Sequence, residues 1–589
     1  MHRKRSAAIA FLFLFTLILT ACHMQNAVVA ENHRFETYTR TLFCQEVSGN
    51  TIALHYTLKN PETYGISPAS VSLGTFVTDT ASVCAALENA QSFLSSFHAN
   101  RLSKENRLTY DILQSYYELE LKLAPYALYE EPLSPLTGTQ SQLPIVLSEY
   151  QFYTITDADT YLKLLEKVPE YFDSILMFEK IRADKGLFMS EDSVNSLTEE
   201  CNAFIKMGKN NYLYTSFESR INALEETKSP TETWSKKSYL KKNETCIKKY
   251  IFPAYQSLID GLSEISDSNH AKRDKQGLCS LPNGKTYYEL LVQRQTGSSR
   301  KIEELKELTK NQMSDDLTAI QMALNGSSSA SPESDLFSSQ GILLEDSNPD
   351  SILVSLQQCM KNAFPKPPSV NVQIKYVSQS MEDYVSPAFY MIPAIDNTKN
   401  NIIYINSGQM PDDLTLFTTL AHEGYPGHLY QNVYYMSQNP NPIRCLLDFG
   451  GYTEGWATYS EMLSYYYAPI SKEEACIMQK NTSLLLGLYA LTDMGIHYDG
   501  WTLSDTVKFF REYGIADADS VKSIYELIVQ DPANYLKYYI GYLEFLELKK
   551  EAIKMWGDEF TQKRFHKVIL DTGPAPFLIL QEQLKAEQN

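Results

Sequence analysis

Hydrophobic positions recur at intervals of three and four residues through most of the first half of the chain. The segments 107–124 and 157–181 show this pattern, each with an apolar stripe bounded by charged residues. Such spacing is typical of helices that pack one face against a core. The pattern therefore predicts a helical N-terminal half over residues 46–330. A Ser-, Gly- and Pro-containing stretch from Asn325 marks a loop or boundary at its end.

The pattern changes to strict alternation beyond that boundary. Residues 370–376 alternate between apolar and polar side chains, which predicts a β-strand. The apolar segments 388–393 and 401–406 stand on either side of a turn-like sequence, as the two strands of a hairpin would. We therefore expect a mainly α fold that contains one small β-sheet.

A helix is expected immediately after this sheet. Pro411 suits the first helical position, and Asp412 and Asp413 suit the positive N-terminal end of a helix. Apolar residues follow at helical spacing and lead to His422. This places His422 on a helix beside the sheet, within a C-terminal half over residues 331–589.

The first 22 residues have the pattern of a bacterial lipoprotein signal. A basic start is followed by an apolar stretch and then by Leu-Thr-Ala-Cys, which resembles a lipobox. The pattern predicts a signal peptide over residues 1–21, a lipid on Cys22 and a lipidated tether over residues 22–45. The protein would then lie outside the cytoplasm, anchored to the cell membrane by its lipid. An uncleaved anchor or a simple secretory signal is the alternative interpretation.

Composition and charge limit the classes of protein and of binding partner that fit this chain. The chain has 589 residues, of which 43% are hydrophobic and 21% charged, as expected of a folded globular protein. A formal net charge of −19 argues against a nucleic-acid partner, because phosphate binding needs a basic face. The eight cysteines that follow Cys22 show no C-x-x-C spacing, so they predict neither a zinc knuckle nor a redox pair.

The sequence AHEGYPGHLYQ, residues 421–431, resembles the zinc-peptidase signature H-E-x-x-H, but its second histidine comes two residues late. In an unbroken helix six steps turn the chain by about 600°, so His428 would point about 120° away from His422. Pro426 and the two glycines around it break helices or accept unusual backbone conformations. We therefore predict a bulge or short loop that turns His428 back toward His422, with a helix resuming near Leu429.

A catalytic zinc ion takes three protein ligands and leaves one position open. Glu454 is the predicted third ligand. Glu461 follows seven residues later on the same helical face, and we predict that it orients a ligating imidazole by accepting a hydrogen bond from its other nitrogen. Glu423 would serve as general base. Zn²⁺ is the expected metal, although two imidazoles and a carboxylate also suit other transition metals. The alternative is that the two histidines merely flank a Gly-Pro turn and Glu454 is a solvated helix residue.

Several motifs together resemble a large bacterial family designated domain of unknown function 885. The similarity extends from the early helical half to the C-terminus and covers nearly the whole mature chain. The first two of the following segments are specific, and the others support them by order and spacing: AHEGYPGHLYQ, GYTEGWATYSE, TDMGIHYDGW, YYIGYLEFLELK, RFHKVILDTGPAPF and LPNGKTYYELL.

This resemblance implies a fold and a set of ligands. The family is similar to the helical gluzincin metallopeptidases, in which two helical halves enclose a central cleft. Carried over residue by residue, the likeness implies that His422, His428 and Glu454 bind the metal and that Glu423 is the base.

Two further roles follow only from the resemblance. Tyr538 matches a tyrosine that would donate a hydrogen bond to the oxyanion, and His497 matches a histidine that would assist it. Equally, Tyr538 could be one of many tyrosines in its helix and His497 could simply be packed. The chain departs from the family where Pro-Gly-Gln-Ala is usual, because Ala533 and Asn534 replace the glycine and the glutamine. That change puts the backbone near Tyr538 or the choice of substrate in question.

Together these features predict a lipid-anchored zinc metallopeptidase that hydrolyses peptide bonds outside the cytoplasm, of an oligopeptidase or carboxypeptidase type. Its expected partners are a peptide substrate and the membrane that holds its lipid. Two alternatives remain open. One is a non-catalytic lipoprotein that binds peptides, and the other is a zinc hydrolase of non-peptide amides or esters.

Overall fold

The structure is a computed structural model that describes residues 26–588, apart from 68, 77, 136, 269–276, 327–345, 378–381 and 383–384. The predicted signal peptide and the predicted lipidation site Cys22 lie outside the described residues, as does most of the predicted boundary loop. None of the helices that the structure describes combines the length and the apolar character needed to cross a membrane.

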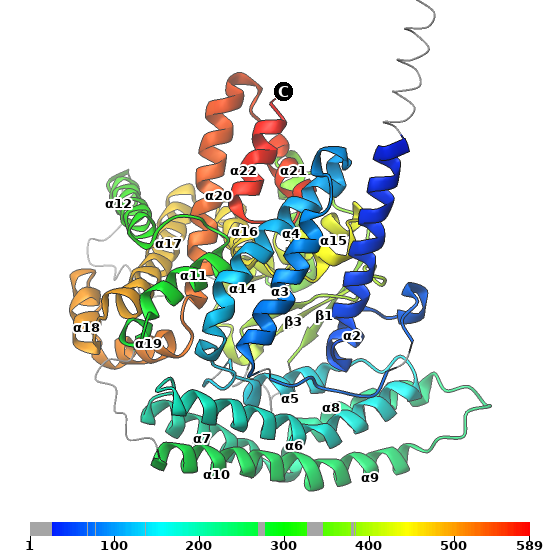
Figure 1. The fold of residues 1–589 in the computed structure, drawn as a ribbon. Helices are drawn as coiled ribbons and strands as arrows, with labels where there is room; N and C mark the ends of the chain where they lie inside the picture. The colour runs from blue at the N-terminus through cyan, green and yellow to red at the C-terminus, as the bar shows by residue number, and fades with distance from the viewer. Residues whose placement is uncertain are drawn as a thin grey trace, which may run out of the picture.

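The described chain is mainly helical, as predicted (Figure 1). A helix over residues 26–47 comes first. The α-helices that follow it in the first part of the chain are α2 (Thr51–Thr57), α3 (Thr80–Ser95), α4 (Lys104–Leu123), α5 (Thr139–Glu149), α6 (Ile155–Asp184), α7 (Glu191–Lys206), α8 (Tyr212–Glu226), α9 (Lys236–Cys246), α10 (Phe252–Ser268), α11 (Gly284–Thr296) and α12 (Ile302–Gly326). Those of the second part are α13 (Pro349–Cys359), α14 (Asp413–Glu423), α15 (His428–Ser437), α16 (Gly450–Ser464), α17 (Lys472–Met494), α18 (Leu503–Glu512), α19 (Ala518–Gln530), α20 (Asn534–Trp556), α21 (Gln562–Thr572) and α22 (Phe577–Ala586).

Shorter helical turns connect several of these helices. They include the 3-10 turns η1 (Pro61–Tyr64), η6 (Leu278–Ser280) and η10 (Pro442–Cys445) and the π-helical turn η11 (Gly495–Asp499). Local capping explains where some of the long helices begin. Thr154 and Asp157 form a reciprocal capping box at the start of α6, and Ser471 and Glu474 form one at the start of α17.

The sheet has three strands in the order β1-β3-β2: β1 (Asn371–Tyr376), β2 (Ala388–Met391) and β3 (Asn400–Ile405). Strands β2 and β3 are antiparallel, so the predicted hairpin is confirmed, and β1 lies parallel to β3. Strand β2 is at an edge of the sheet, and helix α14 packs against it. The sheet therefore borders the helix that carries His422.

Two large hydrophobic cores organise the described chain. Helices α6 to α10 surround one core and form the lower layer of Figure 1. The second core takes in the sheet, helices α13 to α17 and α20 to α22. Helices α11 and α12 also contribute to this second core, although they precede residue 330. The second core therefore begins, along the chain, before the predicted boundary loop.

The segment predicted as a tether is helical from residue 26 onward and packs onto the body of the protein. Phe35 and Phe43 are fully buried in a third, smaller core, together with Leu94 and Phe97. Burial of two phenylalanines stabilises this arrangement by several kcal/mol, on the order of 2 each. This part of the segment is therefore built into the fold and does not serve as a free linker.

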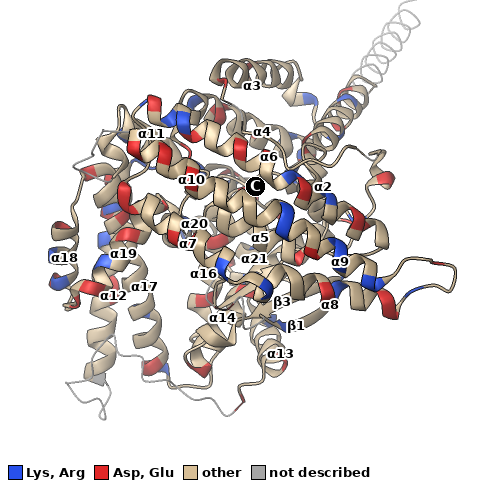
Figure 2. Ribbon diagram, turned by 90° about the horizontal axis from the view of Figure 1, so that it is seen from below, with Lys and Arg blue, Asp and Glu red and all other residues tan. Residues whose placement is uncertain are grey.

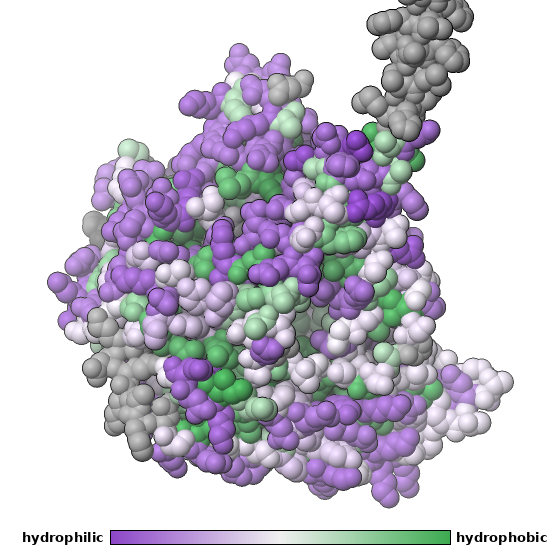
Figure 3. All heavy atoms as spheres, in the orientation of Figure 1, coloured by the Kyte–Doolittle hydropathy of each residue, from purple (hydrophilic) through white to green (hydrophobic). Residues whose placement is uncertain are grey.

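The surface is mixed in charge and in polarity. Seen from below, acidic and basic residues are interspersed along the helices (Figure 2). On the face shown in Figure 3, hydrophobic side chains form scattered patches within a mostly hydrophilic surface.

Candidate metal centre

The helix break predicted after His422 is confirmed. Helix α14 ends at Glu423 and α15 begins at His428, close to the predicted Leu429. Gly427 permits the sharp return, because a Cβ atom at this position would lie 1.8 Å from the carbonyl oxygen of His422. The rings of His422 and His428 consequently lie side by side, with centroids 4.9 Å apart.

Helix α16 holds this turn from the other side. The indole Nε1 of Trp456 donates a hydrogen bond to the carbonyl oxygen of Pro426 at 2.9 Å, and the Ser460 hydroxyl donates to the same oxygen at 3.3 Å. Trp456 is fully buried, so its bond to the turn is shielded from water. The turn and α16 are therefore locked together at the point where both present potential ligands.

Glu454, on α16, completes a converging set of three donor atoms. Its Oε2 lies 3.2 Å from Nε2 of His428 and 3.7 Å from Nε2 of His422. Two ligand atoms of a tetrahedral zinc ion with bonds of about 2.0–2.2 Å are expected to lie roughly 3.3–3.5 Å apart. Two imidazole nitrogens and one carboxylate oxygen at these separations fit a zinc ion in both chemistry and spacing.

Glu461 lies two helical turns beyond Glu454 and contacts the opposite edge of the His422 ring. Nδ1 of His422 is 3.0 Å from Oε2 of Glu461. This contact directs Nε2 of His422 toward Glu454, because an imidazole held at one nitrogen presents the other. Glu461 thus has the geometry of a residue that orients a ligand.

The electrostatics of this cluster favour a cation. Burial acts to lower the pKa of His422, but hydrogen bonds with Glu454 and Glu461 outweigh burial and raise this pKa well above its usual range. Burial acts to raise the pKa of Glu454, but its bonds to the two histidines lower that pKa overall. The raised pKa of His422 shows that the carboxylates create a negative potential in which a positive charge is stabilised, and the lowered pKa of Glu454 shows that this carboxylate is ionised.

Glu423 is fixed beside the imidazoles by the sheet. Its Oε2 accepts a hydrogen bond of 2.7 Å from the backbone N–H of Tyr390, on edge strand β2. Potential ligand atoms of His422, Glu423 and His428 lie within 4.8 Å of one another. A carboxylate held at this distance can exchange a proton with a molecule bound between the imidazoles.

Tyr538, on α20, lies near the same cluster. Its ring plane is inclined by 27° to that of His422, and the two ring centroids are 6.4 Å apart. Burial, followed by the negative charges of Glu454 and Glu423, raises the pKa of Tyr538 above its usual range. The hydroxyl therefore stays protonated at neutral pH and can act as a hydrogen-bond donor.

His497 is held elsewhere, by backbone groups of two other elements. It is fully buried on η11. Its Nδ1 accepts a hydrogen bond of 3.2 Å from the Leu278 N–H, and its Nε2 donates to the Ile528 carbonyl oxygen at 2.8 Å. Burial lowers the pKa of His497 to about 4, so the ring is neutral. Since both ring nitrogens are engaged, the structure does not bring a free nitrogen of His497 to the cluster.

Two contributors to the cluster were not predicted from the sequence. Trp456 stands in the motif with Glu454, but nothing in its spacing indicates a bond to the turn at Pro426. The Tyr390 amide carries no sequence signal, because every residue except proline has a backbone N–H. Only the packing of β2 on α14 brings this amide to Glu423.

Comparisons with known proteins agree on the family and on the fold. The family model described as "Bacterial protein of unknown function (DUF885)" matches residues 77–584. No match is found among curated protein sequences.

Solved structures resemble the chain over nearly its whole length. The crystal structure of "the putative lipoprotein from Colwellia psychrerythraea" is 17% identical, with a TM-score of 0.82, over 95% of this chain and 99% of that chain. "A putative lipoprotein of unknown function from Shewanella oneidensis" is 15% identical, with a TM-score of 0.61 and the same coverage. At these identities the similarity shows a shared fold.

Proposed function

This chain belongs to the bacterial family of unknown function DUF885, and we propose that it is a zinc-dependent metallopeptidase. The observation that carries the proposal is the convergence of two imidazole Nε2 atoms on Oε2 of Glu454, with the Glu423 carboxylate beside them. A purely structural histidine cluster would have no need for Glu423 in this position or for Glu461 behind the His422 ring.

His422, His428 and Glu454 would hold the zinc ion, which when bound polarises a carbonyl group and makes water more acidic. In the proposed reaction Glu423 takes a proton from the attacking water, whose oxygen forms a bond to the peptide carbonyl carbon. The C–N bond then breaks, and Glu423 passes its proton to the departing amine nitrogen. Tyr538 would donate a hydrogen bond to the carbonyl oxygen while negative charge develops there.

The proposal extends to location and to substrate. The lipobox-like sequence that ends at Cys22 supports a lipid anchor and an extracytoplasmic position. The similar structure from Colwellia psychrerythraea is described as that of a putative lipoprotein, which agrees with this placement. We propose a gluzincin-like arrangement in which a cleft between helical halves admits peptides. Oligopeptides or unfolded segments would enter such a cleft more easily than folded proteins.

Metal analysis combined with matched variants tests this function. We expect about one zinc ion per chain in the parent protein and a severe loss of zinc in His428→Ala. Glu423→Gln should keep its zinc and lose peptide hydrolysis by a factor of roughly 10² to 10⁴, because the general base is removed. Glu473→Gln, an exposed glutamate on α17, is the matched control and should behave like the parent.

Three outcomes would overturn the proposal. If the parent protein stays free of zinc after incubation with zinc, the proposed metal site is wrong. If Glu423→Gln hydrolyses peptides as fast as the parent, the proposed role of Glu423 as general base is wrong. Activity confined to ester or non-peptide amide substrates, in a panel that also contains oligopeptides, would contradict the assignment as a peptidase.

A further inference from the structure

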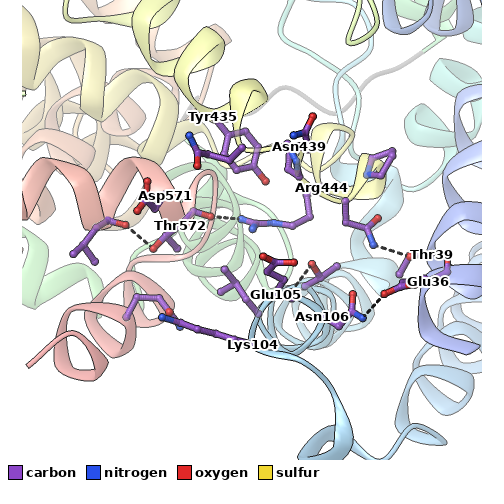
Figure 4. Close-up of a pocket in the computed structure, with 18 of the residues that line it drawn as sticks. Glu36, Thr39, Lys104, Glu105, Asn106, Tyr435, Asn439, Arg444, Asp571 and Thr572 are labelled. Atoms are coloured by element: carbon purple, nitrogen blue, oxygen red, sulfur yellow. Dashed lines mark hydrogen bonds between the residues drawn. The ribbon is translucent and has the colours of Figure 1, made fainter. Parts of the chain in front are cut away.

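A separate cavity of about 960 Å³ lies between the helix of residues 26–47, η1, the start of α4, the loop that follows α15, and helices α21 and α22 (Figure 4). None of the residues that line it belongs to the metal cluster. Its volume lies within the range of about 300–1,000 Å³ that is typical of small-molecule sites.

A buried arginine forms part of this cavity. Arg444, on η10, is only 4% exposed, and its Nη2 donates to the carbonyl oxygens of Thr572 and Pro574 at 2.7 and 2.8 Å. Its Nε is buried and makes no hydrogen bond within the described part of the chain. Arg444 also forms no ion pair with any described residue. A buried cation without a counter-charge is costly, which indicates that an anion completes it.

Tyr435 adds a second unsatisfied group beside this arginine. The Tyr435 ring centroid is 5.4 Å from Cζ of Arg444, and its buried hydroxyl has no hydrogen-bond partner among the described residues. Figure 4 shows both side chains at the cavity. Buried polar groups in folded proteins are nearly always bonded, so two neighbouring exceptions in one cavity point to a ligand with acceptor atoms.

The lining of the cavity carries both acidic and basic side chains. Glu36 and Glu105 line it, on the helix of residues 26–47 and on α4, and Figure 4 shows Glu105 on the opposite side of Arg444 from Tyr435. The lining also includes the acidic side chains Asp571 and Glu587 and the basic side chains Arg40, Lys104, Arg564 and Lys567, so it presents both signs of charge to a ligand. A lining of this kind suits a molecule that carries both charges better than it suits a dianion. Glu36 and Glu105 would attract the ammonium group of a molecule whose carboxylate reaches Arg444. Planar carboxylates also suit the guanidinium group well.

We propose that this cavity binds a small zwitterion, a free amino acid or a short peptide, whose carboxylate pairs with Arg444 and whose ammonium group lies toward Glu36 and Glu105. The two bonds to Thr572 and Pro574 show that Arg444 also ties the loop after α21 to η10. That structural role accounts for Nη2 alone. It leaves Nε of Arg444 and the Tyr435 hydroxyl without hydrogen-bond partners, and it leaves the guanidinium group without a counter-charge. In the proposed complex the bound carboxylate supplies the hydrogen-bond acceptors and the negative charge.

Calorimetric titration of the full chain in detergent, after treatment with a metal chelator to prevent hydrolysis, tests the site. The probes are trialanine, its C-terminal amide and inorganic phosphate. Trialanine should bind, whereas the amide and phosphate should bind at least about tenfold more weakly, since a charged hydrogen bond contributes roughly 1.5–3 kcal/mol. Arg444→Gln should lower the affinity for trialanine by a factor of about ten or more.

Substitutions at exposed glutamates test the site without disturbing the fold. Glu36→Gln and Glu105→Gln should each weaken trialanine binding by about threefold, as expected for a partly screened charge pair, while Glu88→Gln, an exposed glutamate on α3 outside the cavity, should not. Equal binding of trialanine and its amide, preferred binding of phosphate, or unchanged affinity in folded Arg444→Gln would each overturn the proposal. These binding measurements do not depend on zinc content or on peptide hydrolysis. They can therefore contradict the proposed binding site while the proposed function stands, and the metal and hydrolysis measurements can contradict the proposed function while the binding site stands.

Discussion

Ala533 adopts a backbone conformation that usually belongs to glycine. Its φ of 65° lies in the left-handed region, and it directly precedes α20, the helix of Tyr538. Its N–H donates a hydrogen bond of 2.9 Å to the buried carboxyl of Asp493, which holds the backbone in place. The resemblance to the family implies a glycine at this position. Alanine therefore replaces glycine where the left-handed backbone conformation costs alanine free energy.

Replacing this residue by glycine should therefore stabilise the protein. Relief of the left-handed strain is worth about 1–2 kcal/mol, and the greater freedom of glycine in the unfolded chain offsets roughly 0.4–1 kcal/mol. We expect Ala533→Gly to raise the free energy of unfolding by up to about 1.5 kcal/mol in denaturant titrations. A lower free energy of unfolding would show that the Ala533 methyl group, which is fully buried, contributes more by packing than the strain costs.

His497 should make stability depend on pH. Its pKa of about 4 in the folded protein lies below the usual value near 6.5, so protonation favours the unfolded chain. The contribution of neutral His497 to the free energy of unfolding is complete above about pH 6.5 and is lost as the pH falls toward 4. Between pH 7 and pH 5 the folded state should lose about 2 kcal/mol through this residue.

Denaturant titrations of the parent and of His497→Asn at both pH values measure this effect. The variant is expected to be less stable than the parent at pH 7, and the difference should shrink by about 2 kcal/mol at pH 5. A pH-independent difference would mean that His497 does not titrate as the buried neutral group that the structure shows.

At the scale of elements, α16 and α20 pack unusually closely. A Cβ atom on Gly455 would lie 2.4 Å from the backbone carbon of Gly541, and one on Gly541 would lie 2.3 Å from the carbonyl oxygen of Gly451. The two glycines let the backbones approach, and this approach sets the distance between Glu454 on one helix and Tyr538 on the other. The metal cluster therefore depends on a helix contact that contains none of its ligands.

Gly541→Ala tests that dependence. The added methyl group must push the helices apart, which is expected to cost about 1–3 kcal/mol of stability, and peptide hydrolysis should fall as Tyr538 shifts. Thermal unfolding and hydrolysis rates of the variant measure the two effects. Gly49→Ala is the control, since Gly49 is exposed and an added Cβ atom would meet only the Glu46 carbonyl oxygen, at 3.1 Å, which a small shift of this surface turn relieves. Full stability and activity of Gly541→Ala would show that the contact is not limiting.

At the scale of the whole molecule, a bound metal would join three helices. The proposed ligands come from α14, α15 and α16, which all belong to the larger core. Ligand binding to the folded state alone stabilises it, by about 4 kcal/mol when free metal exceeds the dissociation constant a thousandfold.

Chelation should therefore lower the thermal midpoint of the parent protein by several degrees. The thermal midpoint of His428→Ala should be nearly insensitive to the chelator, because its metal is already lost. Thermal unfolding with and without chelator, followed by restoration of zinc, measures both. An unchanged midpoint in the parent would show that no metal is coupled to its folding.

Much of the local structure could be predicted because its causes are local. Apolar spacing indicated the helices, the two apolar segments on either side of a turn-like sequence within residues 388–406 indicated the hairpin, and the Gly-Tyr-Pro-Gly sequence before His428 indicated the helix break. Each of these signals depends on steric and hydrogen-bonding preferences that act within a few residues. The roles of His422, His428 and Glu454 as metal ligands stay predictions, now with the geometry that they require.

The sequence by itself thus determined the helical class, the hairpin, the turn between the two histidines and the family. Only the tertiary structure decided that the Tyr390 amide holds Glu423, that Trp456 holds the turn at Pro426, and that both nitrogens of His497 are bonded to backbone. It also decided that residues from 26 onward pack as a helix onto the body. The physical reason is distance along the chain: these contacts join elements tens to hundreds of residues apart, and they form only when burial of apolar surface packs those elements together.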